Sequence, residues 1–268
     1  MDQPSPVPPA VPSETGPARV FAQAGHGVRV EWGPVGAERL AGEVACLVVV
    51  DVLSFTTSVT VAVEAGTRVF PYRWRDESAA VFAEQVGAAL AVGRRAVSEV
   101  SPWSLSPAAL RRAPFTPRLV LPSPNGSAIA AAAGDDVTVV AASLRNATAV
   151  GQWLSAHGYG TVEHPVGVIA AGERWPDGSL RPALEDLLGA GAVIAELLAL
   201  GGELPSPEAA MAAVAFTGTP DPAAAVTSSS SGRELGEGGF ADDVAVATEL
   251  NVSHVVPVLT DGAFVGVG

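Results

Sequence analysis

The amino-acid sequence predicts an α/β fold with a mostly parallel sheet flanked by helices, and two observations support this. Several short runs of consecutive apolar residues are bounded by polar residues, as in strands that are buried on both faces. Four of these runs are followed by a polar segment and then by a stretch with helical spacing. Because parallel strands are joined through a right-handed helical crossover, this order favours a parallel sheet.

The first half of the chain gives the clearest strand signals. Residues 27–32 alternate apolar and polar side chains, which predicts a strand near a sheet edge. Residues 46–50 are all apolar and predict a buried central strand, and residues 57–64 predict the helix that follows it. Residues 68–72 predict a further short strand, and residues 76–92 carry apolar side chains at helical spacing.

The second half repeats the same order after a proline-rich stretch, residues 102–117, that is expected to be irregular. The strands expected here are residues 118–121, 136–142, 166–171, 253–258 and 263–267. The helices expected here are residues 128–133, a segment ending near residue 156, residues 181–200 and residues 207–216. Residues 218–249 are expected to be helical on both sides of a loop at residues 227–233.

Composition excludes several classes of function. The chain has 268 residues, 48% of them hydrophobic and 16% charged, which is enough for a large core. The single cysteine, Cys46, excludes a disulfide framework and a cysteine-based zinc site. The sequence contains no lysine, which excludes a P-loop lysine and a Schiff-base lysine. The net charge of −13 argues against nucleic acid or an anionic membrane as the main partner.

The chain is expected to form one domain after a tail. Residues 1–18 are rich in proline and predict a disordered tail, and residues 19–268 predict a single α/β domain. Whether residues 218–268 form a separate C-terminal lobe of this domain is left open. No apolar run approaches the roughly 18 residues that cross a bilayer, and no signal-peptide pattern is present, so we expect a cytoplasmic protein with no membrane partner. A homo-oligomer is left open.

Polar side chains follow the predicted strands at their C-terminal ends. Asp51 follows the central strand and is itself followed by hydroxyl side chains. The polar residues at the strand ends are Asp51, Ser54, Thr56 and Thr57; Ser123, Asn125, Gly126 and Ser127; Ser143, Arg145 and Asn146; and Glu173 and Arg174, with Glu185 and Asp186 nearby. Parallel strands end at one edge of a sheet, so we expect one site there. Carboxylate, hydroxyl and amide groups suit Mg²⁺ beside a phosphate.

Each of these residues also has a structural interpretation. Asp51 is a candidate helix cap, as are Ser143 and Asn146. The pair Asn125-Gly126 is a common turn. Glu185 is placed to form an ion pair on an exposed helix face with Arg181, four residues earlier. The convergence of so many polar groups at strand ends favours a functional site over independent caps and turns.

Five segments in order resemble the motifs of the 2-phosphosulfolactate phosphatase (ComB) family. The segments are VVVDVLSFTTSVTVAVEAG, LPSPNGSAIA, AASLRNATAV, AAGERWPDGSLRPALEDLLGAGAVI and SSSSGRELGEGGFADDVAVATELNVSHVVPVL. The resemblance runs from about residue 27 to the end of the chain. It implies a ComB-like α/β fold and a Mg²⁺-dependent phosphohydrolase of coenzyme M biosynthesis, which converts 2-phosphosulfolactate to sulfolactate and phosphate.

The resemblance also implies roles for individual residues. Asp51, Asn125 and Glu185 are expected to be catalytic, and Asp51, Glu185 and Asp186 are expected to bind Mg²⁺. The residues expected to bind the small anionic phosphorylated substrate are Ser54, Thr56, Thr57, Gly126, Ser127, Ser143, Arg145 and Asn146. An alternative expectation is that the protein acts on another small acidic phosphorylated hydroxy acid instead of 2-phosphosulfolactate.

The chain departs from the family pattern at two places. The family usually has an arginine where this chain has Ser54, and it has Gly-Glu-Arg where this chain has residues 93–95. Arg94, Arg95 and Arg145 are therefore candidates for the cation that the site needs. These departures leave a second hypothesis open, that of a catalytically impaired member that binds an anionic metabolite or a protein partner.

Overall fold

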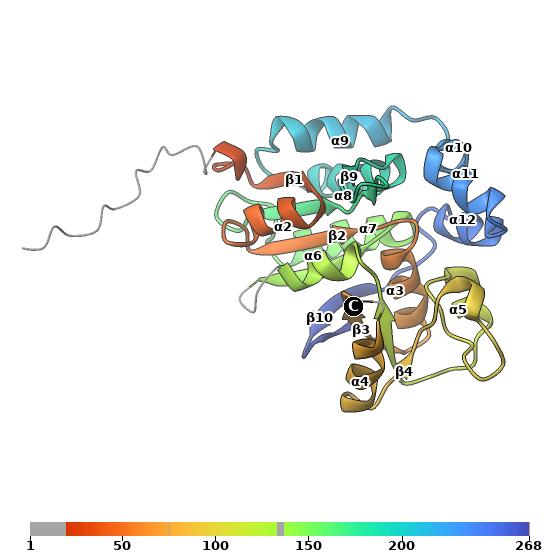
Figure 1. Cartoon of the computed structure of the whole chain (residues 1–268). Coiled ribbons are helices and arrows are strands. Elements are labelled where there is room, and N and C mark those ends of the chain that lie inside the picture. Colours follow the sequence, from red (N-terminus) through yellow and green to blue (C-terminus); the bar gives the residue numbers. More distant parts are fainter. Residues whose placement is uncertain (1–19, 75, 133–136, 268) are drawn as a thin grey trace, which may run out of the picture.

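A computed structural model describes residues 20–74, 76–132 and 137–267, and it confirms the α/β class. The predicted tail, residues 1–18, lies outside the described residues. A central sheet has helices on both faces (Figure 1). Within the described ranges, no helix is both long and apolar enough to cross a membrane.

Nine strands of the described chain form one sheet in the order β1-β7-β2-β6-β10-β11-β3-β5-β4. Their bounds are β1 Val28–Trp32, β2 Cys46–Val50, β3 Arg68–Tyr72, β4 Ala89–Leu90, β5 Arg118–Pro122, β6 Thr138–Ala142, β7 Val166–Ala170, β10 Val256–Thr260 and β11 Ala263–Val267. A separate hairpin pairs β8 (Glu173–Arg174) with β9 (Leu180–Arg181). As predicted, β1 lies at an edge and β2 at the centre of a parallel group.

The sheet is made of two parallel groups that run in opposite directions. Strands β1, β7, β2 and β6 are mutually parallel, and so are β3, β5 and β4. The antiparallel pair β10–β11 joins the two groups and is antiparallel to both neighbours, β6 and β3. The expectation that all polar strand ends share one edge was therefore wrong for β5. The segment after β5 nevertheless comes close to the end of β2. It leads into helix α6 (Gly126–Ala132), which contacts both β3 and β2.

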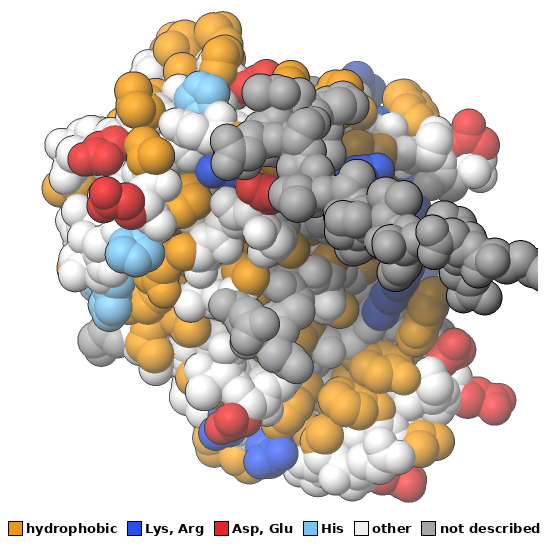
Figure 2. Space-filling view, turned by 90° about the vertical axis from the view of Figure 1, so that its left-hand side faces the viewer, with side chains coloured by type: hydrophobic (Ala, Val, Ile, Leu, Met, Phe, Trp, Pro, Cys, Tyr) orange, Lys and Arg blue, Asp and Glu red, His pale blue; other side chains and the backbone are white. Residues whose placement is uncertain are grey.

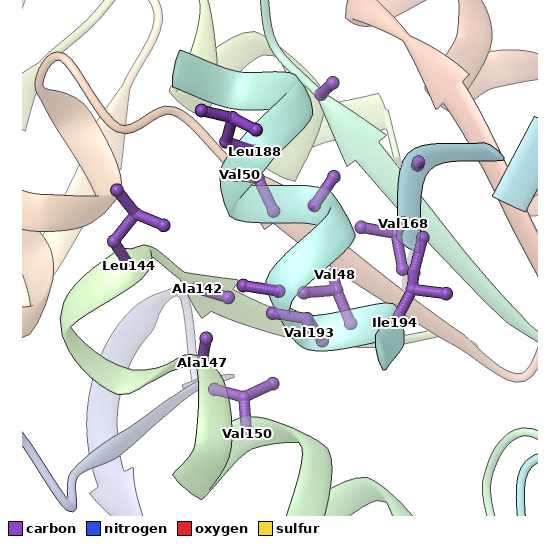
Figure 3. Packing of buried hydrophobic residues seen from close by; sticks show 14 of the residues in the cluster. Val48, Val50, Ala142, Leu144, Ala147, Val150, Val168, Leu188, Val193 and Ile194 are labelled. Carbon is purple, nitrogen blue, oxygen red and sulfur yellow. The ribbon is translucent and has the colours of Figure 1, made fainter. Parts of the chain in front are cut away.

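Two hydrophobic clusters hold helices on the two faces of the sheet. On one face, α7 (Ala147–Ala156) and α8 (Leu184–Ala199) cover β2, β6 and β7, as Figure 3 shows for Leu188, Val193 and Ile194 near Val48 and Val50. On the other face, the alternate strand residues pack against α2 (Gly33–Ala41) and α3 (Phe55–Glu64). Burial on both faces explains why β2 is an uninterrupted apolar run. The central strand is thereby fixed, and so is the residue that follows it.

Several predicted elements differ from the structure. The helix predicted over residues 76–92 ends early as α4 (Glu77–Gln85), and the chain then forms strand β4. The proline-rich stretch contains a helix, α5 (Pro107–Arg112), whose first turn tolerates its proline because that N–H needs no partner. Helix α2 and the β8–β9 hairpin were not predicted.

The C-terminal region is more helical than expected. The loop predicted at residues 227–233 was wrong, since α10 (Pro222–Ser228) is followed at once by α11 (Ser230–Glu237). Ser229 between them is extended and caps α11 by accepting a hydrogen bond from the N–H of Gly232. Helices α9 (Pro207–Thr217) and α12 (Ala241–Ala247) complete this region, and α9 packs along α8 (Figure 1).

On the face shown in Figure 2, hydrophobic and acidic side chains are interspersed, and basic side chains lie in small separate groups. Among the acidic residues considered next, Asp51, Glu185 and Asp186 are buried and Glu173 is partly buried.

Candidate active site

Asp51 lies directly after β2 and is buried, with 6% of its surface exposed. Its Oδ1 atom accepts a hydrogen bond from the N–H of Phe55, the first residue of α3, at 3.0 Å. Its Oδ2 atom accepts one from the N–H of Gly126, the first residue of α6, at 3.1 Å. The capping interpretation is thus confirmed in part, since Asp51 does bind helix N–H groups. The N–H groups of Phe55 and Gly126 are taken up by Asp51 itself, so phosphate binding at Gly126 and metal binding by Asp51 stay predictions.

Gly126 is required where it stands. A Cβ atom at this position would lie 2.2 Å from Cδ1 of the Phe55 ring and 3.0 Å from Oδ2 of Asp51. The backbone of α6 approaches Asp51 this closely only because residue 126 has no side chain. The Asn125-Gly126 pair is therefore more than a turn.

Asp186 joins the ends of two neighbouring strands to α8. Its Oδ1 atom accepts a hydrogen bond from the N–H of Val52 at 2.7 Å, and its Oδ2 atom accepts one from the N–H of Gly172 at 2.8 Å. Val52 follows β2 and Gly172 follows β7. Asp186 therefore holds together the backbone segments that follow β2 and β7, next to Asp51.

Glu185 precedes Asp186 in the first turn of α8 and is 1% exposed. Its Oε2 atom accepts a hydrogen bond from the hydroxyl of Ser229 at 3.3 Å. The exposed ion pair with Arg181 was wrong, because Arg181 contacts Glu234 at 3.9 Å instead. The helix turns Glu185 toward the interior.

Glu173 adds a fourth acid that was noted at its strand end but not selected as a site residue. Its Oε2 atom accepts a hydrogen bond from Nδ2 of Asn125 at 3.4 Å, and the same Nδ2 donates to the carbonyl of Gly172 at 3.2 Å. Arg174 donates from Nε to Oδ1 of Asn125 at 3.3 Å. The sequence signal for Glu173 was its place two residues after a buried strand, beside Gly172.

Burial, together with neighbouring negative charges, raises the pKa values of three of these acids, Glu173, Asp186 and Asp51. Burial raises the pKa of Glu173 from its ordinary 4.5 to about 7, and the charges of Asp51 and Glu185 add to this shift. Burial also raises the pKa of Asp186, with the charges of Asp51 and Glu185 again contributing. Burial is likewise the main cause of the raised pKa of Asp51, while the N–H groups of Phe55 and Gly126 and the charge of Arg94 act against it. Such a concentration of buried acids is typical of functional sites.

Three hydroxyls predicted to bind phosphate are turned toward the backbone. Thr56 donates to the carbonyl of Asp51 at 2.8 Å, and Thr57 donates to the carbonyl of Val52 at 2.8 Å. Ser127 donates to the carbonyl of Leu121 at 3.5 Å. These bonds shape the loop after β2 and the start of α6, and phosphate binding by the three hydroxyls stays a prediction.

The residues after β6 form a structural unit. Oδ1 of Asn146 accepts hydrogen bonds from the N–H and the hydroxyl of Ser143, which confirms the capping interpretation of this pair. Arg145 forms ion pairs with Glu64, the last residue of α3, and with Glu249. Its Nη1 and Nη2 atoms are thus paired away from Asp51, while its buried Nε atom has no hydrogen-bond partner among the described residues. A substrate contact by these residues stays a prediction.

Ser54, directly before α3, binds the guanidinium of Arg94. Its Oγ atom accepts a hydrogen bond from Nη2 of Arg94 at 2.5 Å, and Arg94 also pairs with Asp243 through Nε at 3.0 Å. Of the three arginines considered from the sequence, Arg94 therefore reaches the Asp51 segment. Arg95 is exposed.

The donor set suits Mg²⁺ but does not enclose it. Among the described residues, no three His, Cys, Asp or Glu side chains gather closely enough to hold a metal by themselves. Mg²⁺ usually takes one or two protein carboxylates and completes its coordination with water and substrate phosphate oxygens. Both carboxylate oxygens of Asp51 and of Asp186 already accept backbone hydrogen bonds, and Mg²⁺ binding by Asp51, Glu185 and Asp186 stays a prediction.

Comparison with known proteins links this chain to one enzyme family. The sequence model of the family described as 2-phosphosulpholactate phosphatase matches residues 36–262. A protein of Deinococcus radiodurans, named probable 2-phosphosulfolactate phosphatase, is 31% identical over 224 residues, which cover 82% of this chain and 90% of that protein. A protein of Carboxydothermus hydrogenoformans with the same name is 30% identical over 213 residues, which cover 79% and 84% of the two chains.

Proposed function

The chain belongs to the 2-phosphosulfolactate phosphatase family, and we propose that it hydrolyses the phosphate ester of 2-phosphosulfolactate, or of a closely related acidic phosphorylated hydroxy acid, in a Mg²⁺-dependent reaction. One observation supports this most strongly. Asp51 is held between the first N–H groups of α3 and α6 and lies within a cluster of buried acids at the centre of the fold. Both curated relatives carry the name of this activity.

Hydrolysis of a phosphate monoester needs charge stabilisation and a proton for the leaving oxygen. We propose that Asp51, with Glu185 or Asp186, holds Mg²⁺, which when bound would neutralise phosphate charge and lower the pKa of a bound water. Asp186 positions the backbone at the ends of β2 and β7, so that the acid groups keep their places. A rigid arrangement of this kind stabilises the transition state because little reorganisation is needed during the reaction.

Glu173 and Asn125 supply the polar groups at the rim of this cluster. Because its pKa is raised to about 7, a substantial fraction of Glu173 is protonated near neutral pH. We propose that Glu173 provides the proton that the leaving alkoxide oxygen takes up as its bond to phosphorus breaks. The amide of Asn125, in contact with Glu173, is the group that we expect to donate to a phosphoryl oxygen.

A phosphate-release assay on the full chain tests the proposal. The wild type and Asp51→Ala are assayed on 2-phosphosulfolactate and a panel of small phosphomonoesters, with Mg²⁺ and with a chelator. We expect release by the wild type that depends on Mg²⁺ and falls to background in Asp51→Ala. A wild type that binds 2-phosphosulfolactate without Mg²⁺-dependent release would instead support the non-catalytic hypothesis. The coenzyme M pathway, the cytoplasmic location and a homo-oligomer stay predictions.

A further inference from the structure

The guanidinium of Arg94, in the 3-10 helix η1 (Arg94–Ala96), is fixed on three sides. Its Nε atom donates to Oδ2 of Asp243 at 3.0 Å, and its Nη2 atom donates to Oγ of Ser54 at 2.5 Å. Its Cζ atom lies 5.7 Å from the centre of the Phe240 ring. Because these contacts already restrict the side chain, binding an anion would cost it little conformational entropy.

The carboxylate that holds Arg94 is itself supported. Asp243 is 1% exposed, and its Oδ1 atom accepts hydrogen bonds from the hydroxyl of Ser106 and from the N–H of Ala108 at 3.2 Å. Asp243 comes from α12, while Ser106 and Ala108 come from the start of α5. Two distant parts of the chain thus combine to orient one arginine.

Arg94 also lines a pocket, and it keeps one guanidinium nitrogen free of hydrogen bonds to the described residues. Within the described chain Nη1 of Arg94 makes no hydrogen bond, and 20% of the side chain is exposed. Arg94 lines a pocket of about 370 Å³ that is otherwise mostly apolar, with Leu90, Leu105 and Pro122 among its walls. The acid in this pocket, Asp76, is exposed and caps α4 by accepting from the N–H of Ser78.

The same guanidinium is close to the proposed reaction centre. Ser54, which it contacts, directly precedes Phe55, whose N–H binds Asp51. The charge of Arg94 also acts on Asp51, whose pKa it lowers, and Arg94 lines the pocket as well, so one side chain takes part in both places. We expect a substrate whose phosphate lies at Asp51 to have its other end within reach of Arg94.

We propose that Arg94 binds the non-reacting acid group of the substrate, its sulfonate or carboxylate, and thereby selects phosphate esters that carry a second anion. This inference rests on the proposed function. A charged hydrogen bond from a pre-oriented guanidinium fork suits a planar carboxylate or a sulfonate, and an apolar pocket excludes the water that would compete for it. Arg94 is then a specificity-determining residue, and Asp243 is the residue that positions it.

The test compares Arg94→Ala with the wild type on three phosphate esters. These are 2-phosphosulfolactate, 2-phospholactate, which lacks the sulfonate, and isopropyl phosphate, which lacks both acid groups. We expect Arg94→Ala to lower kcat/KM for 2-phosphosulfolactate roughly 10- to 100-fold, mainly through KM, and to leave isopropyl phosphate within about threefold. If the loss persists on 2-phospholactate, the partner is the carboxylate; if it disappears there, the partner is the sulfonate.

Matched variants and a binding assay complete the test. Arg112→Ala removes an exposed arginine that pairs with Asp242, the neighbour of Asp243, and should change neither value. Arg94→Lys should recover part of the lost affinity. An equal loss on all three esters would overturn the inference. Calorimetric binding of sulfolactate, weakened about tenfold or more in Arg94→Ala, would support it even if no ester were hydrolysed, whereas equal binding by both proteins would overturn it.

Discussion

The carboxylate of Asp51 accepts a hydrogen bond from the backbone N–H of Gly126 at 3.1 Å. This bond joins the end of β2 to the start of α6, although β2 and β5 belong to oppositely directed groups of strands. The site therefore depends on how closely α6 approaches Asp51. The absence of a side chain at residue 126 permits that approach.

Gly126→Ala should displace α6 from Asp51. The new methyl group would collide with the Phe55 ring, which is fully buried and has little space to move. We expect a loss of about 1–3 kcal/mol in the free energy of unfolding, measured with urea, and a loss of phosphatase activity of tenfold or more. Gly236→Ala is the matched control, since its Cβ would meet nothing within 4 Å in α11. Equal behaviour of the two variants would contradict this role of Gly126.

The two adjacent acids of α8 should differ in what they contribute. Asp186→Asn places an amide against two N–H donors, those of Val52 and Gly172, and should destabilise the protein by about 1–3 kcal/mol. In Glu185→Gln the amide oxygen can still accept the hydrogen bond from Ser229, so the free energy of unfolding should change little. Activity should fall in both. Urea midpoints in the reverse order would show that Asp186 is not the residue that fixes the strand ends.

Glu173 should make stability fall as the pH rises. Its pKa is 4.5 ordinarily and about 7 in the folded protein, so the folded state binds more protons than the unfolded chain between these values. The free energy of unfolding therefore decreases from about pH 4.5 to about pH 7. Glu173→Gln removes this titration and should melt higher than the wild type near pH 8, but not near pH 4, in a chelator. A melting difference that does not change with pH would contradict the raised pKa.

Mg²⁺ should stabilise the folded protein by binding to the acid cluster. We expect the melting temperature to rise with Mg²⁺ concentration near pH 8, because burial raises the pKa values of Asp51 and Asp186 and a bound cation would favour their ionised forms. The rise should be much smaller in Glu185→Gln. Sodium chloride at equal ionic strength serves as the control for screening. An equal rise with both salts would exclude a specific site.

The local sequence predicted the parts of the site that lie on single elements. An apolar run ending in one acid located Asp51, and helical spacing placed Glu185 and Asp186 on a helix. That helix was predicted to begin at residue 181 and begins at Leu184, so both acids lie in its first turn. The strands β3 and β11 were also predicted to within a residue, because alternation and turn residues are local signals.

Features that depend on distant contacts were not predicted. The reversal of the sheet at β10–β11 depends on pairing between strands far apart in sequence, which no local pattern specifies. The hydroxyls of Thr56 and Thr57 donate to the carbonyls five residues earlier, bonds that the sequence alone did not indicate. The contact of Arg94 with Ser54 spans 40 residues and could be found only in the fold.

The most direct test of the proposed active site is the kcat/KM of Asp51→Asn for 2-phosphosulfolactate at saturating Mg²⁺. Asp261→Asn is the control, because Asp261 is an exposed turn residue whose positive φ of 51° asparagine also tolerates. We predict a loss of about 10³-fold or more in Asp51→Asn, with the folded structure retained by circular dichroism, and no loss in the control. A value for Asp51→Asn within threefold of the wild type would contradict the assignment of this carboxylate to the reaction centre.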